Sequence, residues 1–91
     1  MMRYNVTIKN RALKQAEKIP MKSRVRVFAG IQNLKDSETW GDVRKLVNHI
    51  YDYRLRVGRY RVLFNLTEDA DNLEIGDISV EEIKKRDEGT Y

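Results

Sequence analysis

Apolar and polar residues alternate near the start of the chain. Tyr4, Val6 and Ile8 are separated by polar residues, and a period of two is typical of a strand with one buried face. Asn10 follows, and its side chain can accept a hydrogen bond from a free backbone N–H in the first turn of a helix. We therefore expect a strand over about residues 3–9 and then a helix that Asn10 caps.

Pro20 divides the next segment into two expected helices. Leu13 and Ala16, together with Ala12, give the first helix an apolar stripe. From Met21 onward apolar residues recur every three or four positions, which predicts a second amphipathic helix. Its expected stripe consists of Met21, Val25, Phe28, Ile31 and Leu34. The β-branched Val25 and Val27 leave a strand over residues 24–28 as the alternative.

Residues 36–50 have a weaker pattern. Trp40-Gly41 and Asn48-His49 indicate a loop, in which residues 43–47 could form one helical turn. Trp40 is the only tryptophan, and we expect it to pack in the core or against the loop. Histidine is a residue type that can act as a general base, but the place of His49 in a loop favours an ordinary surface or core histidine over a catalytic base.

Two alternating runs give the clearest pattern in the chain. Apolar residues occupy the odd positions of 51–57 and the even positions of 60–66, with Gly58-Arg59 between the runs. A two-residue Gly-X loop fits a type II′ turn in which Gly58 has a positive φ, and this turn fixes the register of a hairpin. The predicted core-side pairs are Val57 with Tyr60, Leu55 with Val62, and Tyr53 with Phe64.

The remaining residues complete the expected fold. Residues 67–72 form an acidic turn, and a last strand is expected from Leu73 to about Val80, with a bulge near Gly76-Asp77 where the alternation slips. Residues 81–91 are expected to be a polar tail. The element order β-α-α-β-β-β predicts an α+β fold in which two N-terminal helices pack on one face of a mainly antiparallel four-stranded sheet.

Length and composition restrict the class of protein. The 91 residues suit one domain spanning 1–91. The absence of cysteine excludes disulfides and a thiol nucleophile, and a single histidine excludes a His-rich metal site. We therefore expect no metal and no small-molecule cofactor. No segment has the length of a signal-peptide core or of a membrane span, so we expect a soluble, unprocessed cytoplasmic protein with no membrane partner.

Positive charge is concentrated in the first two thirds of the chain. Residues 1–66 contain fifteen Lys and Arg against five Asp and Glu, whereas residues 67–91 contain three against nine. The hairpin register puts Arg56 opposite Arg61 on the face away from the helices, with Arg54 two residues along. Like charges so placed destabilise a sheet, and the hairpin puts no acidic residue directly opposite either of them. This arrangement favours binding of RNA or DNA phosphates; the alternative is solvent-exposed arginines paired with carboxylates of the tail.

The hairpin sequence resembles that of a known family. Residues 53–64, YRLRVGRYRVLF, are similar to the paired strands of the RelE/ParE toxin superfamily, which typically read Y/W-R-L-R-V-G-x-Y-R-V-L-Y. Residues 83–91, IKKRDEGTY, resemble the closing basic-plus-tyrosine motif of that family. The resemblance implies the toxin of a type II toxin–antitoxin pair with a cognate antitoxin as partner. For the RelE branch it further implies a metal-independent, ribosome-dependent endoribonuclease that cleaves mRNA.

The resemblance also implies which residues form the site. The catalytic positions correspond to Arg54, Arg56, Arg61, Arg86 (or Lys85 if the register shifts by one) and Tyr91. Arg61 and Arg86 would stabilise charge on the reacting phosphate, and Tyr91 would stack on a base or transfer a proton. Further RNA contacts are expected from Lys45, Arg59, Lys84 and Lys85. The general base is unassigned, because arginine stays protonated where relatives have lysine.

Two other functions remain open from the sequence. One is a ParE-like, non-enzymatic inhibitor of gyrase, and the other is a basic module that binds RNA without cleaving it. Arg56 opposite Arg61, together with a terminal tyrosine, favours the endoribonuclease over both.

Overall fold

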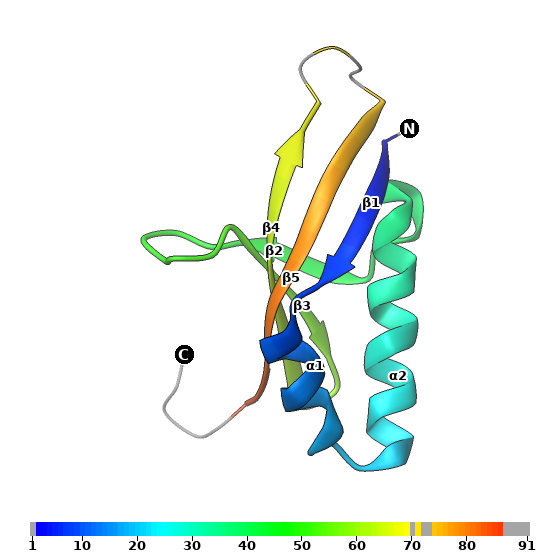
Figure 1. The fold of residues 1–91 in the computed structure, drawn as a ribbon, viewed down its shortest axis with the longest axis vertical. Coiled ribbons are helices and arrows are strands. Elements are labelled where there is room, and N and C mark those ends of the chain that lie inside the picture. The colour runs from blue at the N-terminus through cyan, green and yellow to red at the C-terminus, as the bar shows by residue number, and fades with distance from the viewer. Residues whose placement is uncertain (1, 70, 72–73, 87–91) are drawn as a thin grey trace.

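The computed structural model describes residues 2–69, 71 and 74–86, and they form one sheet with two helices beside it (Figure 1). The helices are α1 (Asn10–Glu17) and α2 (Met21–Gln32), joined through Pro20 as predicted. Two short 3₁₀ turns follow α2, at residues 33–35 and 37–39. The strands are β1 (Arg3–Ile8), β2 (Asp42–Lys45), β3 (Tyr53–Val57), β4 (Tyr60–Glu68) and β5 (Ile75–Lys85). Within the described ranges, no helix has the length and apolar character needed to cross a membrane.

The sheet has five strands in the order β1-β5-β4-β3-β2, so the expectation of four strands is wrong. The additional strand is β2, where the sequence predicts a loop with a helical turn over 43–47. The sequence of β2 is DVRK, which is too short and too polar to show an alternating pattern. Pairing with the edge of β3 creates this strand, because it satisfies the backbone groups of both segments. β1 runs parallel to β5, and the other neighbours are antiparallel.

Both helices contribute to one core on the same face of the sheet, which we call the helix side. Buried residues of α1 and α2 pack there against the buried residues of β3, β4 and β5: Ala12, Ala16, Val27, Ile31, Leu55, Val62, Phe64, Ile78, Val80 and Ile83. The opposite face, which carries Arg54, Arg56 and Arg61, is called the open face. The expected arrangement of two helices on one face is therefore observed.

The buried stripes of the helices differ from the predicted ones. Met21 and Val25 are 67% and 60% exposed, whereas Val27 is fully buried. The stripe of α2 is thus rotated toward positions 27 and 31, and the alternative strand over 24–28 is wrong. In α1, Leu13 is exposed and the two alanines make the contact. Asn10 does not cap α1, because strand pairing continues to Lys9, whose N–H bonds the Val80 carbonyl, and Lys9 takes the N-cap position.

The last strand is longer than predicted and its irregularity lies elsewhere. β5 continues to Lys85, so the first half of the expected polar tail is strand. Leu63 pairs with Glu82 and Phe64 with Val80, which leaves Glu81 as the extra residue of a bulge. At Gly76, the expected bulge position, the strand passes under the Tyr4 ring, where an added Cβ would lie 2.8 Å from a ring carbon. The close approach of the Tyr4 ring to the backbone therefore explains why position 76 is a glycine.

Trp40 packs on the helix side, as expected. Its ring lies 5.4 Å from Tyr4 and 6.1 Å from Phe64, centroid to centroid. The indole Nε1 donates a hydrogen bond to the Leu34 carbonyl at 2.9 Å. Trp40 thus fixes the chain that leads from α2 into β2, and it helps to hold the edge strand beside β3.

Candidate functional site

The β3–β4 hairpin has the predicted register. Val57 pairs with Tyr60, Leu55 with Val62 and Tyr53 with Phe64. Gly58 has φ +57°, whereas Arg59 is not among the residues with positive φ, which fits the predicted type II′ turn. The register is therefore set by the turn, and it decides which residues reach the open face.

Three cations from three neighbouring strands lie opposite one another on the open face. Arg56 on β3 pairs with Arg61 on β4, and Arg61 pairs with Lys84 on β5. We call these three residues the cationic row. Arg61 is at its centre and is only 8% exposed. Directly opposed like charges cost a sheet several tenths of a kcal/mol, so the row does not by itself stabilise the fold, and its clustered donors could bind an anion.

Asp42 lies at the end of this row, and the sequence analysis did not find it. β2 puts Asp42 opposite Arg56. Its Oδ2 accepts a hydrogen bond from Arg56 Nε at 2.9 Å, and its Oδ1 lies 3.3 Å from Arg54 Nη1. The hydrogen bond from Arg56, helped by the charge of Arg54, lowers the pKa of the Asp42 carboxyl below its usual value. Among the described residues, Arg54 and Arg56 are thus paired with a carboxylate of an unpredicted strand.

Glu82 is a second carboxylate on the open face. It accepts hydrogen bonds from the Tyr51 hydroxyl at 2.7 Å and from Gln15 Nε2 at 3.1 Å. Arg11 and Lys84 lie within 3.6 and 3.9 Å of its oxygens. Burial raises the pKa of Glu82, but these hydrogen bonds and charges outweigh burial and lower it. The sequence analysis assigned this residue to a polar tail, so its role at the site was missed.

Tyr51 also differs from expectation. The alternation predicts it on the core side, but β3 begins only at Tyr53. The hydroxyl of Tyr51 instead reaches Glu82, and this hydrogen bond, together with burial, raises the pKa of the phenol. His49 lies beside it in the exposed loop, where its Nδ1 accepts a hydrogen bond from the Tyr51 backbone N–H at 3.1 Å. His49 is thus an exposed loop residue.

The remaining candidate residues are divided between the two faces. The Arg86 N–H bonds the Arg59 carbonyl at 2.6 Å, which continues the β4–β5 ladder by one residue. Alternation along this ladder assigns Arg86 to the open face with Lys84. Lys85 pairs with Tyr60, and Lys45 with Tyr53, on the helix side. Lys45 and Lys85 are therefore separated from the cationic row, and Tyr91 lies outside the described residues.

Comparison with known proteins yields matches in structure only. No family model matches the chain, and no curated protein matches it. A chain of the archaeal RelE–RelB complex from Pyrococcus horikoshii is 25% identical, with a TM-score of 0.71 over 97% of this chain and 100% of that one.

Two further complexes contain similar chains. The toxin–antitoxin complex RelBE2 from Mycobacterium tuberculosis gives a TM-score of 0.70 at 18% identity, over 93% of this chain and 100% of that one. The RelB–RelE antitoxin–toxin complex from Methanococcus jannaschii gives a TM-score of 0.62 at 20% identity, over 86% of this chain and 87% of that one. These matches confirm the resemblance that the hairpin motif indicates, and the chain has a RelE-like fold.

Proposed function

We propose that this protein is the toxin of a type II toxin–antitoxin pair and that it acts as a metal-independent endoribonuclease on ribosome-bound mRNA. The similarity to chains of three RelE–RelB complexes supports the toxin assignment and a cognate antitoxin as partner. The observation that carries the enzymatic part is Arg61, a nearly buried guanidinium flanked on both sides by cations.

The cationic row suits one reaction on an RNA phosphate. The 2′-oxygen of the substrate attacks the adjacent phosphorus while a base accepts the proton of the 2′-hydroxyl. The bond from phosphorus to the 5′-oxygen then breaks, and that oxygen takes up a proton. The products are a 2′,3′-cyclic phosphate and a 5′-hydroxyl. The atoms and electrons of this reaction balance without a metal or a redox partner.

The protein residues would act mainly through charge. In the attack, negative charge builds up on the non-bridging phosphate oxygens, and preorganised donors that face them lower the barrier most. Arg61 and Arg56 present planar groups that can each donate two hydrogen bonds to a phosphate. Lys84 adds a point charge from the third strand. We assign Arg54 and Arg86 to the grip on the RNA backbone, and Tyr91 to stacking or proton transfer.

Asp42 gives a reason to keep a second candidate function. Its ion pairs with Arg54 and Arg56 hold these side chains in place, but they also occupy donors that a phosphate would need. A protein in which these pairs persist would bind RNA without cleaving it. The two functions therefore differ in whether a phosphate displaces Asp42 from the arginines.

One experiment tests the proposal. The purified protein is added to an in vitro translation reaction with purified ribosomes, and primer extension maps cuts in the mRNA. Cuts at the ribosomal A site that disappear in Arg61→Ala, but not in the matched Arg3→Ala, are expected. RNA binding without cuts would instead support the silent RNA-binding protein, and inhibition of DNA supercoiling without cuts would support a gyrase inhibitor.

A further inference from the structure

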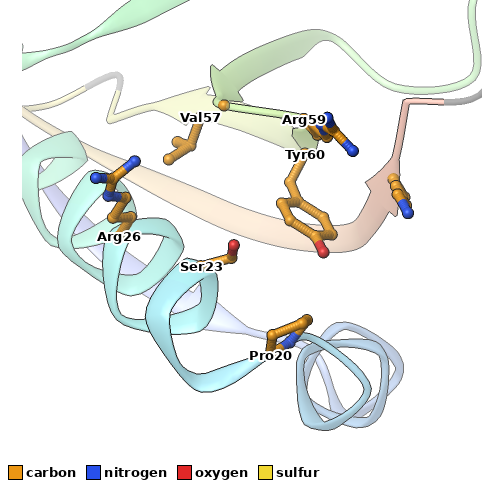
Figure 2. A pocket seen from close by; sticks show the side chains of 8 residues that line it. Pro20, Ser23, Arg26, Val57, Arg59 and Tyr60 are labelled. Carbon is orange, nitrogen blue, oxygen red and sulfur yellow. The ribbon is translucent and has the colours of Figure 1, made fainter.

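A second cationic feature lies on the other side of the hairpin. A cleft of about 400 Å³ opens between the first turns of α2 and the β3–β4 turn, on the helix side of the sheet (Figure 2). We call it the tip cleft. Its volume is within the roughly 300–1,000 Å³ that small-molecule sites occupy. The residues that matter for the argument are Pro20, Ser23, Arg26, Arg59, Tyr60 and Lys85.

Every charged residue that lines the tip cleft is a cation. Arg26 comes from α2, Arg59 from the hairpin turn and Lys85 from the end of β5. In the part of the chain that the structure describes, none of these three forms an ion pair. This differs from the open face, where Asp42 and Glu82 pair with the neighbouring cations. A site rimmed by cations attracts an anionic ligand.

The interior of the cleft suits a flat ring. Tyr60 packs against the core, which holds its ring in place, and Figure 2 shows the ring directed into the cleft with its hydroxyl toward the space between Ser23 and Pro20. Ser23 Oγ lies across from it on α2. An exposed face of a fixed aromatic ring is a stacking surface for a nucleic-acid base, and two hydroxyls add polar contacts.

The two cationic features are connected through the hairpin tip. Lys84 and Lys85 are consecutive residues that alternation sends to opposite faces of β5. Arg59 lies in the turn beside the end of β5, where its carbonyl accepts a hydrogen bond from the Arg86 N–H. At this end of the hairpin, cations therefore lie both on the open face and around the tip cleft.

We propose that the tip cleft binds one nucleotide of the RNA strand whose scissile phosphate lies on the cationic row. The base stacks on Tyr60, and the phosphate lies among Arg26, Arg59 and Lys85. This inference rests on the proposed RNA substrate, and it adds a subsite on the opposite face of the sheet. The subsite would hold the strand in place while the row engages the reacting phosphate.

Salt dependence of binding provides the test. The full chain is titrated into a fluorescein-labelled single-stranded RNA oligomer at several salt concentrations, and fluorescence anisotropy gives the dissociation constant at each one. For single strands, each lost phosphate contact reduces the slope of log K against log salt by about 0.7. Arg26→Gln and Lys85→Gln should each show this reduction. The matched controls Arg3→Gln and Lys35→Gln remove the same charges far from the hairpin tip and should keep the wild-type slope.

Each outcome decides the inference. Equal slopes in the cleft variants and the wild type, or equal losses in cleft variants and controls, would overturn it. If Arg61→Gln weakens RNA binding while the cleft variants do not, the proposed function stands and the tip cleft is not a subsite. If the wild type binds no RNA, the tip cleft is not a subsite and this inference fails, whereas the proposed function is decided separately by the cleavage assay with ribosomes. In a parallel titration, a labelled acidic peptide replaces the RNA. Cleft variants that bind this peptide more weakly but bind the RNA like the wild type would assign the cleft to a protein partner and also overturn the inference.

Discussion

Replacement of Arg61 by alanine should separate catalysis from folding. Arg61 is the central member of the cationic row, with Arg56 opposite it on one side and Lys84 on the other. If the row stabilises charge on a reacting phosphate, loss of its central donor should slow cleavage about 10²- to 10³-fold, the usual effect of removing one such donor. RNA binding should weaken far less, because the two flanking cations remain.

The effect on stability should be small because two terms oppose each other. The substitution removes two methylene groups of a side chain that is 8% exposed, which costs about 1.6 kcal/mol at about 0.8 kcal/mol per buried methylene. It also relieves repulsion with the two directly opposed cations, which returns about 0.2–1 kcal/mol for each pair. The net change in unfolding free energy is then within about 1.5 kcal/mol.

Single-turnover cleavage and thermal unfolding measure the two effects separately. Arg3 provides the control, because it is a strand arginine on the open face of the distant β1. Arg3→Ala should keep both the cleavage rate and the melting temperature. An unchanged rate in Arg61→Ala would refute the role of the cationic row. A loss of cooperative unfolding would instead show that this guanidinium is required for the fold.

Three further predictions follow from the carboxylates and from the turn. Asp42→Asn frees the two arginines of β3, so RNA should bind more tightly and with a steeper salt dependence in anisotropy titrations; unchanged binding would show that Asp42 does not compete with phosphate. The lowered pKa of Glu82 means that its contribution to stability is present above its ordinary pKa and is lost as pH falls through the lowered value. Acid denaturation of Glu82→Gln should therefore lack part of the loss that the wild type shows below pH 4.5, and identical acid curves would contradict this. Gly58→Ala should destabilise by about 1–2 kcal/mol through its positive φ alone, since an added Cβ meets no atom within 4 Å; Gly41→Ala, with ordinary contacts and no positive φ, is the control in chemical denaturation, and equal losses would show that φ is not the cause.

The sequence predicts the hairpin well because its determinants are local. Strict alternation on both strands and a two-residue Gly-X turn fix which residues pair, and the pairing of Arg56 with Arg61 follows from them. The helix break at Pro20 is predicted for the same reason. These features need no knowledge of the rest of the chain.

The features that were missed depend on non-local pairing. β2 is a strand because it lies along the edge of β3, and its four residues have no pattern of their own. The position of Asp42 beside the arginines could therefore not be predicted. Glu82 reaches the open face only because the bulge at Glu81 shifts the alternation of β5, and that shift depends on the register with β4. Both carboxylates at the site were missed because strand pairing places them there, and the residue type alone does not indicate that pairing.

The position of β5 inside the sheet, between β1 and β4, constrains when the protein can mature. Among the described residues β5 is the last strand in chain order, yet it joins β1 to β4. Until it has been synthesised, β1 has no neighbouring strand and Arg61 has no Lys84 beside it. A nascent chain that ends before Lys85 thus holds neither a finished sheet nor a finished charge cluster. The charge cluster can therefore assemble only after the ribosome has added the segment that carries Lys84.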